Sequence, residues 1–498
     1  MMEYAAGIWC DRLHTIDVES KDAGKVNQFY GALYRASFLP HEMSDVNGDY
    51  PEFSTGTVKM GNATLSSKGY AVPAYSYLRK YGDFSMWDIY RAELPLYSLI
   101  TPKMSGEMMQ SLVQMYKEGG WMPIFPCWNS YTAAMIGDHS GAALADAYVK
   151  GIRNFDAAKA YEGMRLNAFS TPYLAKDYRD GKGRRAIKSY MDNGYIPLED
   201  MVEEAFHTNE QTSRTLEYAY DDYAVAQMAK ALHDSCQDAT LRQKYLEDYN
   251  DLMRRSENWR NVINSATGWA DGRYENGKWE NNEDLVHRKS YITEGATCHY
   301  TWYVPQNPEG LFEVIRNSKP MDKQEKQIEK MERKMEKKGE TPVRNEKVIA
   351  RLDKMFDNGW YWHGNEPCHQ VAYLYDAAGA PEKTQERVHH ILQTEYNDTP
   401  GGLSGNDDAG QMSAWYVFSS IGFYPVCPGT PYYYIGTPSF DKVTLNLENG
   451  RKFILSADRQ HMDDYLIQSV TLNGKPLGDY RLSHQQILTG GELHFQMK

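Results

Sequence analysis

Two adjacent carboxylates at the start of a buried helix are the residues best placed to do chemistry in this chain. Asp407 and Asp408 follow a glycine-rich loop and precede the segment from Gln411 to Ile421, whose apolar character predicts a buried helix ending at Gly422. In the simplest interpretation Asp408 caps this helix and Gln411 closes a capping box. Two acids among four nearby glycines exceed what one cap requires. A carboxylate aimed into a cleft or at a metal ion is therefore the second interpretation.

A third acid, Glu294, lies in an aromatic segment that also contains Tyr291, Tyr300 and Trp302. Such surroundings withdraw a carboxyl group from water and raise its pKa, which suits a proton donor near neutral pH. The alternative is an acid that only begins a helix. This segment alone does not choose between the two.

A loop rich in glycine and proline offers oxygen ligands for a cation. It contains His363, Asn365, Glu366 and His369. The two histidines are six residues apart and have no cysteine partner, which disfavours zinc. The oxygens of Asn365 and Glu366 would suit a hard cation such as calcium.

Aromatic side chains accompany charged ones in an earlier segment. Asp88 and Arg91 are one helical turn apart, where a salt bridge is the simple explanation. Trp87 beside this pair also fits one wall of a sugar subsite. A proline-interrupted loop presents Trp121 and Trp128.

Further acids occur on a helix expected over residues 213–230. Glu217, Asp221 and Asp222 fall in the first half of this helix, where they suit the helix dipole. A structural role is at least as well supported there as a catalytic one.

Composition excludes several classes of protein. The 498 residues carry a net charge of -13, which disfavours binding to nucleic acid because no basic patch offsets it. Aromatic residues make up 13% of the chain, a mild indication of carbohydrate binding. No apolar run approaches the roughly 20 residues of a membrane-spanning helix. The first residues lack the plan of an export signal.

The patterns predict a mainly α-helical fold followed by a small β domain. Helical spacing extends from about residue 16 to 422, and a highly charged run at 319–347 predicts a solvated surface helix. After Val426 the pattern changes to short strands separated by turns. The strands are expected at 432–435, 442–447, 452–455, 467–472 and 492–496.

Several motifs in this order resemble glycoside hydrolase family 92, the calcium-dependent exo-α-mannosidases. The resemblance extends from about Trp9 to the end of the chain. The segments that carry it are Ser85–Arg91, Gly120–Pro123, Met135–His139, Asp146–Gly151, Thr215–Asp222, Glu294–Gly295, Tyr300–Trp302, Gly364–Pro367, Gly405–Phe418 and Gly422–Pro425.

The resemblance implies a fold, a reaction and a cofactor. Residues 16–425 should form an (α/α)6 barrel with a charged insertion near 319–347, residues 426–498 the β domain, and residues 1–15 the remnant of a linker. The reaction would be inverting hydrolysis that releases terminal mannose from N-glycans or mannans. Ca²⁺ would bind the 2- and 3-hydroxyls of that mannose and help to distort its ring.

The resemblance also implies a role for particular residues. Glu294 matches the general acid, and Asp408 is the first choice for the general base with Asp407 as the second. An inverting pair has its carboxyl groups about 6.5–9.5 Å apart, which leaves room for the attacking water. The calcium ligands would include Asn365, Glu366 and Asn406, and the residues expected to contact substrate are Trp87, Asp88, Arg91, Trp121, His139 and His363.

Departures from the family pattern leave alternatives open. Family members usually begin with a β-sandwich domain that shares the cleft and usually carry an export signal, and the chain is expected to lack both. Asn365 stands where some members have His, which leaves the linkage preference open. A mannoside-binding fragment without activity is one alternative, and a different (α/α)6 carbohydrate-active enzyme is the other.

Overall fold

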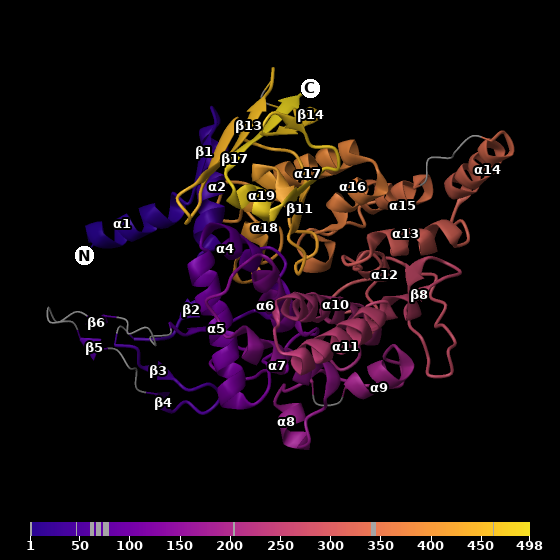
Figure 1. Ribbon diagram of the computed structural model, residues 1–498. Coiled ribbons are helices and arrows are strands. Elements are labelled where there is room, and N and C mark those ends of the chain that lie inside the picture. Colours follow the sequence, from indigo (N-terminus) through magenta and orange to yellow (C-terminus); the bar gives the residue numbers. More distant parts are fainter. Residues whose placement is uncertain are drawn as a thin grey trace.

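The computed structural model describes residues 2–45, 47–59, 64–65, 71–72, 79–202, 205–339, 345–461 and 463–498. Helices dominate up to Ile421, and a β-sheet built mostly from the last 60 or so residues lies at one end of the molecule (Figure 1). The expected mainly α fold with a C-terminal sheet is confirmed. The (α/α)6 arrangement of the helices stays a prediction.

The α-helices differ widely in length, and the longer ones form the body of the molecule. They are α1 (Met2–Leu13), α2 (Ala23–Arg35), α3 (Met86–Ile89), α4 (Glu93–Ile100), α5 (Pro102–Gly119), α6 (His139–Val149), α7 (Ala157–Phe169), α8 (Ala175–Arg179), α9 (Ile187–Asn193), α10 (Gln211–Ser235), α11 (Ala239–Arg255), α12 (Thr297–Tyr300), α13 (Pro308–Asn317), α14 (Lys323–Lys337), α15 (Glu346–Asp357), α16 (Leu374–Ala378), α17 (Pro381–Thr394), α18 (Gln411–Ile421) and α19 (His484–Leu488).

Helix α10 is the central element of the helical region. It packs against α6, α7 and α11, and its first twelve residues are all buried, charged side chains included. A helix surrounded by protein has no solvent face, so its sequence shows no clear apolar stripe. This burial places Glu217 and Asp221 inside the protein rather than on a dipole-stabilised surface.

The C-terminal sheet has six strands in the order β1-β12-β13-β17-β14-β15. Its strands are β1 (Ile16–Glu19), β12 (Lys442–Asn446), β13 (Lys452–Asp458), β14 (Ile467–Leu472), β15 (Lys475–Pro476) and β17 (Gly491–Met497). A second sheet joins β10 (Phe423–Tyr424), β11 (Tyr432–Ile435) and β16 (Arg481–Ser483). Buried residues alternate with exposed or partly exposed ones along β12 and β13, so one face of the sheet is covered.

The edge strand β1 comes from the opposite end of the chain. It pairs antiparallel with β12, with Val18 opposite Val443, and Figure 1 shows it beside the C-terminal strands. Residues 16–19, which the expected boundaries assign to the helical domain, thus lie in this sheet. Such pairing over hundreds of residues has no local sequence signal.

The short elements that remain are mostly two-residue strands and 3₁₀ turns. They are β2 (His41–Glu42), β3 (Tyr50–Pro51), β4 (Val58–Lys59), β5 (Thr64–Leu65), β6 (Ala71–Val72), β7 (Tyr81–Gly82), β8 (Ile263–Asn264), β9 (Trp269–Ala270), η1 (Asn258–Asn261), η2 (Glu366–Cys368), η3 (Val371–Tyr373) and η4 (Asp408–Gly410).

The charged run forms helix α14, which projects from the body (Figure 1). Most of its side chains are exposed, as expected of a solvated helix, and residues 340–344 of the run lie outside the described residues. Glu325 is an exception, because it is buried and makes an ion pair with Arg351 at 3.0 Å. This pair anchors α14 to α15. Among the described residues, no helix combines the length and apolarity needed to cross a membrane.

Candidate active site

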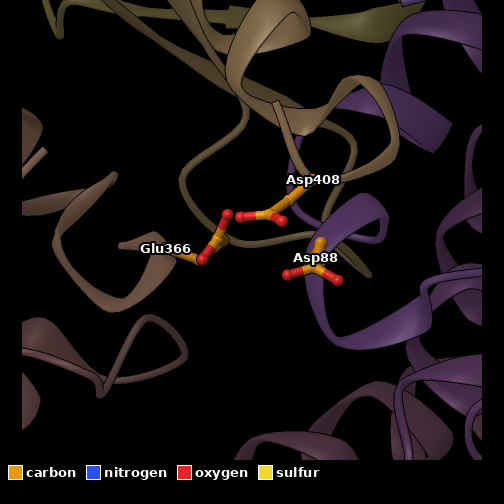
Figure 2. Close-up of side chains that lie close together, drawn as sticks. All are labelled: Asp88, Glu366 and Asp408. Atoms are coloured by element: carbon orange, nitrogen blue, oxygen red, sulfur yellow. The ribbon is translucent and has the colours of Figure 1, made fainter. Parts of the chain in front are cut away.

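Three carboxylates from distant segments meet at one point. Asp88 lies in α3, Glu366 begins η2 and Asp408 begins η4, and each offers an oxygen that lies within 4.8 Å of those of the other two. The close-up shows the three side chains converging (Figure 2). Asp88 and Glu366 are buried and Asp408 is half-buried. We call these residues the acidic trio.

A tight turn begins at Asp408, directly after Asp407. Asp408, Ala409 and Gly410 have φ values of 44°, 60° and 102°, all in the left-handed region. Glycine is needed at the last position, because a Cβ there would lie 3.0 Å from the Cα of Ala36. The side chain of Asp407 stays with the helix, where Oδ1 accepts a hydrogen bond from the Ser413 amide at 2.9 Å.

The interpretation of Asp408 as the cap of α18 is therefore wrong. Asp408 accepts no cap hydrogen bond from α18, and Asp407 accepts one instead. Gln411 does not close a capping box either. Its Oε1 accepts hydrogen bonds from the amides of Ala92 at 2.8 Å and Glu93 at 3.3 Å, so it caps the start of α4, a helix hundreds of residues away.

Burial, helped by nearby carboxylates, raises the pKa of every member of the acidic trio. Burial raises the pKa of Asp88 to about 8, helped by the charges of Asp408 and Glu294 and opposed by Ser85 and Arg91. Burial, with Asp88 and Asp408, raises the pKa of Glu366 well above its usual range. Burial also raises the pKa of Asp408. Three such groups do not all ionise unless a positive charge joins them.

The chemistry of the acidic trio fits a hard divalent cation. Carboxylate oxygens are the ligands that Ca²⁺ prefers. Oε1 of Glu366 is buried without a hydrogen-bond partner among the described residues, as expected of an oxygen that would bind a cation. The same cluster could also hold a water molecule for general-base attack.

Glu294 lies beside this cluster in the turn before α12. It has a φ of 48°, it is half-buried, and its backbone oxygen accepts a hydrogen bond from Nδ2 of Asn365 at 3.2 Å. Its charge contributes to the raised pKa of both Asp88 and Asp408, so Glu294 lies near the acidic trio. The structure thus brings together the acid and the first-choice base named from the sequence.

A buried polar network supports Trp87 behind the acidic trio. Trp87 Nε1 and the Tyr300 hydroxyl donate hydrogen bonds to Oε1 of Glu217 at 2.9 and 3.0 Å. His139 links the other oxygen of Glu217, at 3.3 Å, to Asp221, at 2.7 Å. Trp87 and His139 are 2% and 1% exposed, so they contact the network and not the solvent.

His139 is held as a cation in this network. Burial lowers its pKa, but the carboxylates of Asp221 and Glu217 outweigh that effect and raise the pKa to about 9. Its ring also stacks on Tyr90 with centroids 4.0 Å apart. The sequence did not single out Glu217 and Asp221 for this role. Their spacing of four residues on one helix beside apolar positions was the available signal.

Arg91 is buried one helical turn after Asp88 and does not pair with it. Its Nε donates to the Trp87 carbonyl at 3.0 Å, and its guanidinium lies 4.9, 4.8 and 5.3 Å from the ring centroids of Trp87, Tyr90 and Tyr303. The expected salt bridge with Asp88 is absent from the ion pairs of the described residues. Nη2 of Arg91 is buried and has no hydrogen-bond partner there.

The other residues named from the sequence have different surroundings. His363 is 1% exposed, and its two ring nitrogens meet the hydroxyls of Tyr361 at 2.7 Å and Tyr396 at 2.6 Å. Trp121 is partly buried, with its backbone bonded to Tyr131. Asn406 is exposed. Of the proposed metal ligands, Glu366 belongs to the acidic trio, and Asn365 contacts the carbonyl of Glu294 beside it.

The helical fold and its acidic site are those of a glycosidase catalytic domain. A sequence model of the glycosyl hydrolase family 92 catalytic domain matches residues 1–498. The chain belongs to glycosyl hydrolase family 92.

Solved and curated relatives agree with this assignment. A family GH92 α-mannosidase of Bacteroides thetaiotaomicron is 30% identical with a TM-score of 0.81, over 99% of this chain and 57% of that one. A family GH92 inverting mannosidase of the same species is 30% identical with a TM-score of 0.81, over 100% of this chain and 62% of that one.

A curated relative, described as an uncharacterized secreted glycosidase of Arthroderma benhamiae, is 29% identical over 82% of this chain and 50% of its own length. The chain thus spans half of this curated relative and about three fifths of the two solved relatives.

Proposed function

We propose that this protein is an inverting exo-α-mannosidase that uses Ca²⁺. The observation that carries the proposal is the convergence of Asp88, Glu366 and Asp408 beside Glu294. Membership of family 92 supports the reaction class. One solved relative is described as an inverting mannosidase, and another is in complex with mannoimidazole.

In this mechanism Glu294 protonates the departing glycosidic oxygen. Asp408 removes a proton from the water that attacks the opposite face of the anomeric carbon. Asp407 is the second choice for this base. Asp88, Glu366 and Asp408 would hold the cation, which supplies a positive charge for the sugar hydroxyls. Arg91 and Asp88 would lie close to the bound sugar. The hydrogen bond from Nε1 to Glu217 holds the Trp87 ring in place.

The substrate class follows from the same assignment. We propose mannose-terminated N-glycans or mannans as substrates, with the secreted relative supporting action outside the cell. A role as a mannoside-binding domain without activity is the second proposal, because the acidic trio could hold a cation that binds sugar hydroxyls without any hydrolysis.

Proton NMR of an α-mannoside digest tests the reaction. Inversion predicts that β-mannose appears first and that the α-anomer forms only by later mutarotation. Chelation of Ca²⁺ should abolish the signal, and added Ca²⁺ should restore it. Release of α-mannose first would contradict the inverting mechanism. Binding of mannosides by a folded protein that releases no sugar would favour the binding domain.

A further inference from the structure

An exposed tryptophan lies beside the proposed acid. Trp362 is 46% exposed, whereas the next residue, His363, is 1% exposed. The Tyr361 hydroxyl contacts Nδ1 of the buried His363, so these two side chains point into the protein. Trp362, between them in the chain, projects toward solvent instead.

The indole of Trp362 is fixed against the loops that carry the site. Its Nε1 would lie 2.8 Å from a Cβ at Gly364, so glycine at this position lets the indole edge rest on the backbone. The same glycine touches Gly405, in the loop that leads to Asp408. The ring is thus held where the segments bearing Glu366 and Asp408 meet.

The ring also lies on the side of Glu294. Its centroid is 6.5 Å from that of His299, whose Nδ1 accepts a hydrogen bond from the Ala296 amide, two residues after Glu294. Asn365, three residues after Trp362, donates to the Glu294 carbonyl. The proton from Glu294 goes to the leaving group, so the ring stands on the leaving-group side of the scissile bond.

From this placement we propose that Trp362 is the platform on which the leaving-group sugar stacks. The face of an indole is electron-rich, and the C–H groups of a pyranose present a complementary positive surface. The occupant is the first pyranose ring beyond the terminal mannose. This inference rests on the proposed glycosidase activity and adds a residue that selects the aglycone.

Two substrates distinguish stacking of the leaving-group sugar from a general contribution of Trp362 to activity. α-Mannosyl fluoride has no leaving-group sugar, whereas an α-linked mannobiose has one. We expect Trp362→Ala to lower kcat/KM for the mannobiose about tenfold and to leave that for the fluoride within about twofold. Trp362→Phe should restore part of the loss. Tyr432→Ala is the control, because Tyr432 is 48% exposed but lies on β11 of the C-terminal β region.

Binding measured without turnover gives a second readout. In a Glu294→Gln background, Trp362→Ala should weaken the affinity for mannobiose about tenfold and leave that for methyl α-mannoside unchanged. Equal losses for both ligands, or no loss for mannobiose, would overturn the platform. A wild-type protein that hydrolyses neither the fluoride nor the mannobiose would refute the proposed function itself. That result differs from one that overturns only the role of Trp362.

Discussion

Asp407 and Asp408 are neighbours in the chain, yet their carboxylates serve different parts of the molecule. Asp407 accepts a hydrogen bond from the Ser413 amide at 2.9 Å, and Asp408 meets Asp88 and Glu366. The left-handed turn over residues 408–410 produces this division. Two acids that look equivalent in the sequence thereby acquire separate roles.

Asparagine at each position should separate the two roles. We expect Asp408→Asn to lower kcat about 10²–10⁴-fold, because it removes the proposed base. Asp407→Asn should lower the free energy of unfolding by about 1 kcal/mol through a weaker helix cap and change kcat only slightly. Steady-state kinetics and urea unfolding of both variants test this. If Asp407→Asn lowers kcat more than Asp408→Asn does, Asp407 rather than Asp408 is the base.

Replacement of the acid should depend on the leaving group. Glu294→Gln is expected to lower kcat about 10²–10⁴-fold for an alkyl α-mannoside, whose departing oxygen needs a proton. Hydrolysis of α-mannosyl fluoride should fall far less, since fluoride departs without strong acid assistance. The ratio of the two rates in wild type and variant is the measurement. Equal loss on both substrates would remove Glu294 from the role of acid.

Ca²⁺ should stabilise the folded protein through the acidic trio. At a concentration one hundred times Kd, binding contributes about 2.7 kcal/mol, which thermal unfolding detects as a higher Tm. Glu366→Gln should remove most of this increase because it removes the negative charge and one of the two carboxylate oxygens. Asp234→Asn, which alters an exposed acid paired with Lys230 at 2.6 Å, should leave it intact. An increase that survives Glu366→Gln would place the cation elsewhere.

The charged His139 should make stability depend on pH. The folded-state pKa of about 9 exceeds the ordinary 6.5, so the folded protein binds more protons between these values. This contribution is fully present below pH 6.5 and is lost as pH rises through 9, with a size of roughly 3 kcal/mol. Urea unfolding with chelator present, from pH 6 to 10, should show a shrinking difference between wild type and His139→Gln. A constant difference would mean that His139 is not preferentially charged.

His363 should affect stability more than substrate binding. His363→Leu leaves the hydroxyl of Tyr361 without its hydrogen-bond partner and should lower the free energy of unfolding by about 1–3 kcal/mol. KM for an α-mannoside is expected to stay within about twofold of wild type. A large rise in KM at full stability would instead support the substrate contact expected from the sequence.

Local chemistry made several elements readable in the sequence alone. The predicted bounds of α18, from Gln411 to Ile421, match those of the structure, as do the bounds of β14, from Ile467 to Leu472. Apolar spacing and the glycine at 422 reflect interactions between residues only a few positions apart, so both can be read from the sequence. The family resemblance, which rests on many ordered motifs, was also readable there.

Tertiary structure alone decided how the site is assembled. Asp88, Glu366 and Asp408 become neighbours only when three distant segments pack together, and Asp88 had been expected to contact substrate rather than to join such a cluster. Burial likewise placed His139 and His363 inside polar networks, where their ring nitrogens are occupied. Residue types and spacing determine which groups are available for chemistry. Distances between remote segments and access to water arise only from the packed chain, so they set the pKa and the partner of each group.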